Sequence, residues 1–108
     1  MSTSPIPLFD AAQPHRRTMG DGALQVEVLS LFVTEAERLM RQVEDAPDPH
    51  VRGDRLHAII GLARNTGAVR LAQAARQLET EITIENPDLA PLRAALSETL
   101  AYVHQAGI

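Results

Sequence analysis

The feature of this sequence that most restricts its fold is a repeated spacing of apolar residues at intervals of three and four positions. The spacing recurs in four segments, and we expect helices over residues 23–45, 50–65, 68–84 and 89–106. Such a spacing gathers the apolar residues on one side of a helix. Aromatic residues make up only 3% of the chain, so the core must consist of Leu, Ile, Val and Ala, which favours helices over a sheet.

A short break that contains Pro or Gly precedes each predicted helix. These breaks are the segments 20–22, 47–49, 66–67 and 86–88. Short connections join antiparallel neighbours, so the sequence predicts an all-α, antiparallel up-down-up-down four-helix bundle over residues 21–108. Residues 1–20 are expected to form an N-terminal arm with a possible short helix, because Leu8 and Phe9 precede a possible N-cap at Asp10.

Each predicted helix has an apolar stripe that we expect to be buried. The stripes consist of Leu24, Val28, Leu31, Phe32, Ala36, Leu39 and Val43; Leu56, Ile59 and Ala63; Leu71, Ala75, Leu78 and Ile82; and Leu89, Leu92, Leu96, Leu100 (or Thr99) and Val103.

Composition excludes several classes of function. The formal net charge of −4 argues against nucleic acid as a partner, and the absence of cysteine excludes disulfides and thiolate chemistry. The N-terminus does not resemble a signal peptide, and no apolar run is long enough to span a membrane. We therefore expect a cytoplasmic protein that binds neither a membrane nor nucleic acid.

Three kinds of catalytic site lack their motif. The four histidines, His15, His50, His57 and His104, do not have the spacing of metal ligands, so we expect no metal site. A nucleotide-binding glycine loop is absent, so the chain should have no cofactor of its own and no ATP-dependent kinase activity. A Gly-x-Ser-x-Gly elbow is absent too.

His57 is the candidate for chemistry. It lies beside the apolar stripe of the second predicted helix, with Gly61 one turn later and Arg64 close to the same line. Glycine in a helix costs roughly 1 kcal/mol relative to alanine, so Gly61 indicates either clearance for a partner or close packing of another helix. A lone histidine on a helix is usually a surface or half-buried residue without a chemical role, and Arg64 is also typical of a salt bridge with Asp54 or Glu79.

The positions His57, Gly61, Ala63, Gly67, Ala68 and Leu71, with the Ala-rich helix that ends in Leu78-Glu79, resemble a histidine-containing phosphotransfer (Hpt) domain. The resemblance covers nearly the whole chain. One position departs from the family pattern, because Ile60 stands where the family usually has lysine. The family fold is a four-helix bundle with a short helix at one end, and Leu8 and Phe9 fit that capping helix.

The resemblance implies that His57 accepts a phosphoryl group from an aspartate of a response-regulator receiver domain and passes it to another receiver. It implies receivers and a hybrid histidine kinase as partners, with Mg²⁺ in the receiver, and we expect a monomer. Arg64 is our candidate to replace the lysine in stabilising the phosphoryl group. Candidate partner-binding residues are Ile60, Gly61, Asp54, Leu8 and Phe9, although Leu8, Phe9 and Ile60 also fit a core.

Two other functions remain open. The chain is either a degenerate relative that binds a kinase or receiver as a scaffold or inhibitor without carrying phosphate, which Ile60 favours, or a helical interaction module without a signalling role.

Overall fold

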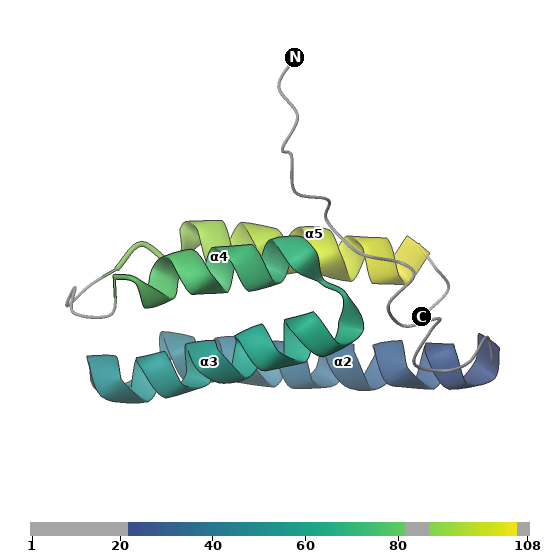
Figure 1. The fold of residues 1–108 in the computed structure, drawn as a ribbon, viewed down its shortest axis with the longest axis horizontal. Helices are drawn as coiled ribbons and strands as arrows, with labels where there is room; N and C mark the ends of the chain where they lie inside the picture. Colours follow the sequence, from purple (N-terminus) through teal and green to yellow (C-terminus); the bar gives the residue numbers. More distant parts are fainter. Residues whose placement is uncertain (1–21, 82–86, 106–108) are drawn as a thin grey trace, which may run out of the picture.

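The computed structural model describes residues 22–81 and 87–105, in which the only regular elements are four helices (Figure 1). They are α2 (Gly22–Glu44), α3 (Pro49–Thr66), α4 (Val69–Glu79) and α5 (Ala90–Gln105). The all-α prediction is confirmed for these residues. The predicted arm, its short helix, and the residues Leu8 and Phe9 lie outside the described ranges.

The helices form two layers around one core. In Figure 1, α2 and α3 lie on one side and α4 and α5 on the other. Contacts join α2 to α3, α3 to α4, α4 to α5 and α2 to α5, so the four helices enclose a common interior. No helix in the described ranges has both the length and the apolar character needed to cross a membrane.

Defined caps fix both ends of α3, the helix that carries His57. Asp48 precedes the helix and its Oδ1 accepts a hydrogen bond of 2.9 Å from the Val51 N–H, while Pro49 occupies the first turn. At the other end Gly67 has a φ of 86°, a left-handed conformation that costs glycine little. Only Gly67 and Ala68 separate α3 from α4, and α4 packs beside α3.

Most of the predicted stripe residues lie in the core, but Leu31 does not. Its exposed fraction is 67%, whereas that of Phe32 is 1%. Leu31 lies about 100° round the helix from Phe32, beyond the edge of the buried stripe. The prediction that Leu31 is buried is therefore wrong. The buried apolar residues of α2 are Leu29, Phe32, Ala36, Leu39, Met40 and Val43.

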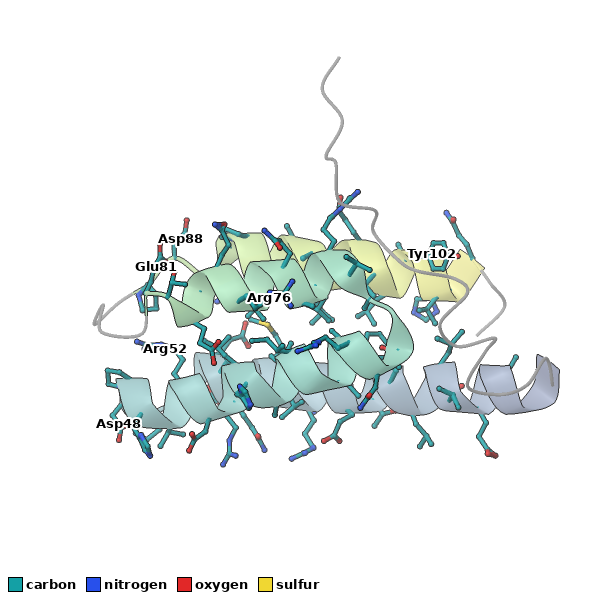
Figure 2. The ribbon with its side chains drawn as sticks, in the orientation of Figure 1. Asp48, Arg52, Arg76, Glu81, Asp88 and Tyr102 are labelled. Atoms are coloured by element: carbon teal, nitrogen blue, oxygen red, sulfur yellow. The ribbon has the colours of Figure 1, made fainter. Side chains whose placement is uncertain are left out.

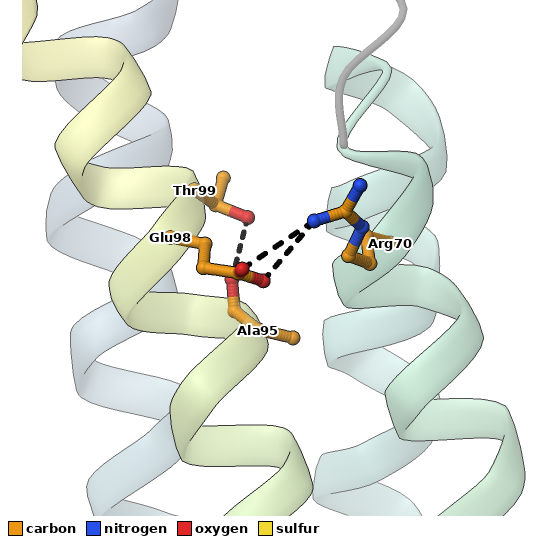
Figure 3. Close-up of polar contacts among 4 residues, drawn as sticks. All are labelled: Arg70, Ala95, Glu98 and Thr99. Atoms are coloured by element: carbon orange, nitrogen blue, oxygen red, sulfur yellow. Dashed lines mark hydrogen bonds and ion pairs between the residues drawn. The ribbon is translucent and has the colours of Figure 1, made fainter. Parts of the chain in front are cut away.

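A polar contact joins α4 to α5 (Figure 3). Arg70 Nη1 lies 3.4 Å from each carboxylate oxygen of Glu98. Thr99 is fully buried, and its hydroxyl donates a 2.7 Å hydrogen bond to the Ala95 carbonyl, so this polar group does not disrupt the core. Thr99, rather than the half-buried Leu100, is thus the buried residue at this level of α5.

The third predicted helix, which is α4 in the structure, is shorter than the sequence predicts. α4 ends at Glu79 rather than at residue 84, and Thr80 follows in a turn where its hydroxyl donates a 2.6 Å hydrogen bond to the Gln77 carbonyl. Ile82 lies outside the described residues. The early end leaves Glu79 in the last turn of α4, a position that matters for the site.

Candidate functional site

His57 stands on the surface of α3, directly beside the core. Its side chain is 81% exposed, while the neighbouring Leu56 is completely buried. The alternation follows from the helix geometry, since consecutive residues lie about 100° apart. The prediction that His57 lies next to the buried face, rather than within it, is confirmed, and the imidazole is accessible to a large partner.

Glu79 reaches the same place from α4. Its Oε2 lies 3.5 Å from Nδ1 of His57, and its side chain is 36% exposed. This separation is within ion-pair range and longer than a typical hydrogen bond of about 2.7–3.2 Å. The contact uses Nδ1, so Nε2 is the nitrogen that points away from the carboxylate. Within the described ranges, Nε2 has no hydrogen-bond or ion-pair partner.

Sequence reasoning missed Glu79 as a member of the site. From the sequence, Glu79 is expected only as a possible salt-bridge partner of Arg64. The available signal was its place at the end of the Ala-rich helix. The short turn at Gly67 joins this helix to α3, and the packing of α4 on α3 puts Glu79 beside His57.

Gly61 leaves an open space one turn beyond His57. The residue is exposed, and a Cβ added there would meet no atom of another described part of the chain within 4 Å. Close packing of a neighbouring helix therefore does not explain this glycine. Because glycine weakens a helix, its presence without a packing reason fits clearance for something outside the molecule.

Arg64 is exposed and lies on the same side of α3 as His57. The two salt bridges considered for it are not formed: Asp54 Oδ2 is 3.8 Å from His50 Nε2, and Glu79 faces His57. Across the described part of the chain, Arg64 makes no hydrogen bond or ion pair. Its guanidinium is therefore available to an anionic group near His57.

Ile60 does not contribute to a docking surface, contrary to prediction. Its exposed fraction is 5%, and it belongs to the hydrophobic core. Ile60 lies four positions after Leu56 and three before Ala63, which are both buried. This spacing puts Ile60 on the buried side of α3. The structure supports the alternative that Ile60 is a core residue.

The predicted site residues thus divide into three groups. His57, Gly61 and Arg64 share one exposed side of α3, and Asp54 is exposed one turn before His57. Ile60 is in the core, and Leu8 and Phe9 lie outside the described ranges. Among the residues that the structure describes, no three histidine or carboxylate side chains gather where they would hold a metal ion.

Comparison with known proteins agrees with this arrangement. The family model described as the Hpt domain matches residues 27–106, well over half of the 108 residues. Domains of this family act in phosphoryl transfer in two-component phosphorelays and interact with receiver domains and histidine kinases. Neither the curated proteins nor the solved structures gave a match. From its helices and the extent of the family match, the chain belongs to the Hpt domain family.

Proposed function

We propose that this protein is a phosphotransfer intermediate of a multistep phosphorelay, with His57 carrying the phosphoryl group between receiver-domain aspartates. The proposal rests on the surroundings of the His57 imidazole, which is 81% exposed and has its Nδ1 facing the Glu79 carboxylate. That arrangement leaves Nε2 as the accessible nucleophilic atom.

Glu79 orients the ring in this proposal. A carboxylate accepts hydrogen bonds, so it favours the neutral tautomer with the proton on Nδ1 and the lone pair on Nε2. The 3.5 Å separation shortens to a hydrogen bond through a small side-chain movement, as contacts in unbound sites commonly do. Glu79 then also stabilises the positive charge that the ring acquires when Nε2 bonds to phosphorus.

The transfer step is a substitution at phosphorus. Nε2 of His57 attacks the phosphorus of an aspartyl phosphate in the receiver, an N–P bond forms, and the P–O bond to the aspartate breaks. The electron pair of that bond leaves with the aspartate carboxylate. The same step in reverse delivers the group to a second receiver. The receiver supplies the Mg²⁺ for both directions, and this chain supplies the imidazole.

Arg64 assists the transferring group. The phosphoryl group carries its charge on three oxygens during transfer, and a guanidinium can donate to two of them. Arg64 lies seven residues after His57, which is about two helical turns, so its long side chain must extend back along α3 to reach the phosphoryl group. Its exposure and the lack of a competing ion pair among the described residues support this role.

We also propose that the four helices that present His57 follow the antiparallel up-down-up-down order. Two residues separate α3 from α4 and four separate α2 from α3, and such short connections join antiparallel neighbours. The position of Glu79 beside His57 fits this order.

The second candidate is an Hpt-like protein that binds a receiver or kinase without carrying phosphate. Ile60 favours it, because the family position that usually holds lysine is apolar here and its side chain is buried. In this case His57 would be a surface residue of a scaffold or inhibitor.

Label transfer separates the two candidates. The protein is incubated with a receiver carrying radioactive aspartyl phosphate, and the product is tested for label that is acid-labile and base-stable. Label on the wild type that disappears in a helical His57→Gln variant supports the relay. Tight binding without label supports the second candidate, and neither binding nor label contradicts both.

A further inference from the structure

The chain contains no lysine, and its ten basic residues other than histidine are all arginines. The lysine that is usual in the family would stand three residues after His57, where this chain has the buried and uncharged Ile60. A phosphoryl group in transfer carries negative charge on its oxygens, and a nearby cation stabilises that charge. If His57 carries a phosphoryl group, an arginine at another position must therefore supply the positive charge.

Most of the described arginines are engaged in contacts or lie away from His57. Arg38, Arg70 and Arg93 form ion pairs with carboxylates, Arg52 is buried, and Arg41 and Arg55 line a hollow between α2 and α3 to which α4 contributes no residue. The two that remain are Arg64 on α3 and Arg76 on α4, and both are exposed. The choice between them depends on how α4 lies against α3.

The packing of α4 on α3 puts Arg76 at the level of Ile60. The two-residue link joins the helices at one end, and the contact between His57 and Glu79 joins them further along. The number of residues from His57 to the link equals the number from the link to Glu79 to within one. In the antiparallel order proposed above, residues equally far from this contact thus lie opposite each other. Arg76, three residues before Glu79, lies opposite the residue three after His57.

Arg76 also lies on the side of α4 that faces α3. It is about 60° round the helix from Glu79, which contacts His57. Leu78, which borders a hollow shared with α5, is about 100° from Glu79 in the other direction. Figure 2 shows Arg76 at the edge of α4 that is next to α3. Because Arg76 is exposed, its guanidinium stands at the rim of the boundary between the two helices.

Arg76 is nearer to His57 along the helix axes than Arg64 is. One turn, about 4.5 Å of rise, separates the level of Arg76 from that of His57, whereas Arg64 is about 10.5 Å away along α3. Packed helices lie about 8–10 Å apart, a gap that a long arginine side chain and a histidine ring bridge together. Arg76 thus approaches from α4 the place that the family's lysine takes on α3.

The Arg76 guanidinium has no strong contact to give up. Its Nη2 lies 3.5 Å from Oε1 of Gln73, longer than a typical hydrogen bond, and it makes no ion pair within the described ranges. Gly61 keeps the approach open, because even a Cβ there would meet no other described part of the chain within 4 Å. The Glu79 carboxylate brings a negative charge to the ring that receives the negative phosphoryl group. A cation on the same side offsets this repulsion.

We propose that Arg76 binds the phosphoryl group on Nε2 of His57, in place of the lysine that is usual in the family. Its guanidinium donates hydrogen bonds to the phosphoryl oxygens as the N–P bond forms, and it releases them when the group passes to the next receiver. Arg64 is then a second and more distant cation. The inference rests on the proposed function.

The test compares the rates at which two donors phosphorylate His57, a phosphorylated receiver at saturation and phosphoramidate. With phosphoramidate, Nε2 attacks the phosphorus, the P–N bond of the donor breaks, and ammonia leaves with the electron pair. Arg76→Ala should slow both reactions about tenfold or more, the effect of losing a donor to the charge of the transition state. The half-saturating receiver concentration should stay at the wild-type value, because Arg76 acts on the phosphoryl group.

Two further measurements identify the guanidinium as the active group. Arg76→Lys should be slowed less than Arg76→Ala, because lysine keeps the charge and loses the paired donors. Added methylguanidinium should restore part of the rate of Arg76→Ala, whereas sodium chloride at the same concentration should not. The matched control is Arg55→Ala, which removes an exposed arginine on the side of α3 that faces α2. It should keep the wild-type rate with both donors, and circular dichroism confirms that each variant is folded.

The two donors separate failure of the inference from failure of the proposed function. A folded Arg76→Ala variant that both donors label at the wild-type rate contradicts the inference and leaves the proposed function intact. Slowing with the receiver alone would make Arg76 a docking residue and would also overturn the inference. If neither donor labels the wild type, the proposed function is wrong and the inference falls with it.

Discussion

Nδ1 of His57 lies 3.5 Å from Oε2 of Glu79, a contact between α3 and α4 that leaves the imidazole side chain 81% exposed. The contact connects the fold with the chemistry, because the Gly67 turn and the packing of α4 on α3 determine where the carboxylate lies. It also distinguishes the two ring nitrogens, which the sequence alone does not.

The first prediction concerns Glu79. Glu79→Ala should slow phosphoryl transfer at saturating receiver by roughly 10- to 100-fold, the usual effect of losing a residue that orients a reacting imidazole. Glu79→Gln should be less affected, because its amide oxygen still accepts from the Nδ1–H. Single-turnover transfer measures both rates. Equal rates for the wild type and the alanine variant would show that Glu79 has no positioning role.

The second prediction concerns Gly61. Gly61→Ala should stabilise the protein by up to about 1 kcal/mol, since a Cβ has open space there and alanine favours a helix. The melting temperature should therefore rise by up to about 4 °C. Gly61→Gln should fold equally well and slow transfer from the receiver, because its side chain projects beside His57. Normal transfer by the glutamine variant would remove the functional reason for the glycine.

The third prediction concerns Arg64. Arg64→Ala should slow transfer while the free energy of unfolding changes by less than about 0.5 kcal/mol, as is usual for an exposed residue without an ion pair. Arg64→Lys should fall between the two rates, because lysine keeps the charge and loses the paired donors. Transfer rates and urea unfolding provide the two measurements. An alanine variant with the wild-type rate would contradict the proposed role.

The fourth prediction separates core from surface. Ile60→Ala should lower the free energy of unfolding by about 2–5 kcal/mol, because the side chain is 5% exposed and its removal leaves a cavity. Leu31→Ala should change it by less than about 0.5 kcal/mol, since Leu31 is 67% exposed. Urea unfolding of both variants measures the difference. Similar losses at the two positions would contradict the assigned burial.

The sequence was sufficient for those features that depend on one helix at a time. Apolar spacing located α3 and α5 to within a residue or two of their ends, and it put His57 beside the buried Leu56. Pro49 and Gly67 identified the ends of α3 because their backbone preferences act locally.

Features that depend on packing between helices could not be predicted. Leu31 fits the same three-and-four spacing as its buried neighbours, and only the place of α3 against α2 decides which edge of the stripe is exposed. Glu79 is far from His57 along the chain, so their contact requires the folded arrangement of α3 and α4. The resemblance makes Ile60 a candidate for docking because receivers meet such domains through an apolar patch around the histidine, whereas its spacing from Leu56 puts it on the buried side of α3.

The most direct test of the relay is the identity of the phosphorylated atom. The protein, labelled with ¹⁵N in its histidines, is treated with a phosphorylated receiver, and NMR of the imidazole nitrogens locates the new N–P bond. We expect phosphorus on Nε2 of His57 and an Nδ1 that keeps its proton beside Glu79. Phosphorus on Nδ1, on another residue, or on none at all would contradict the account.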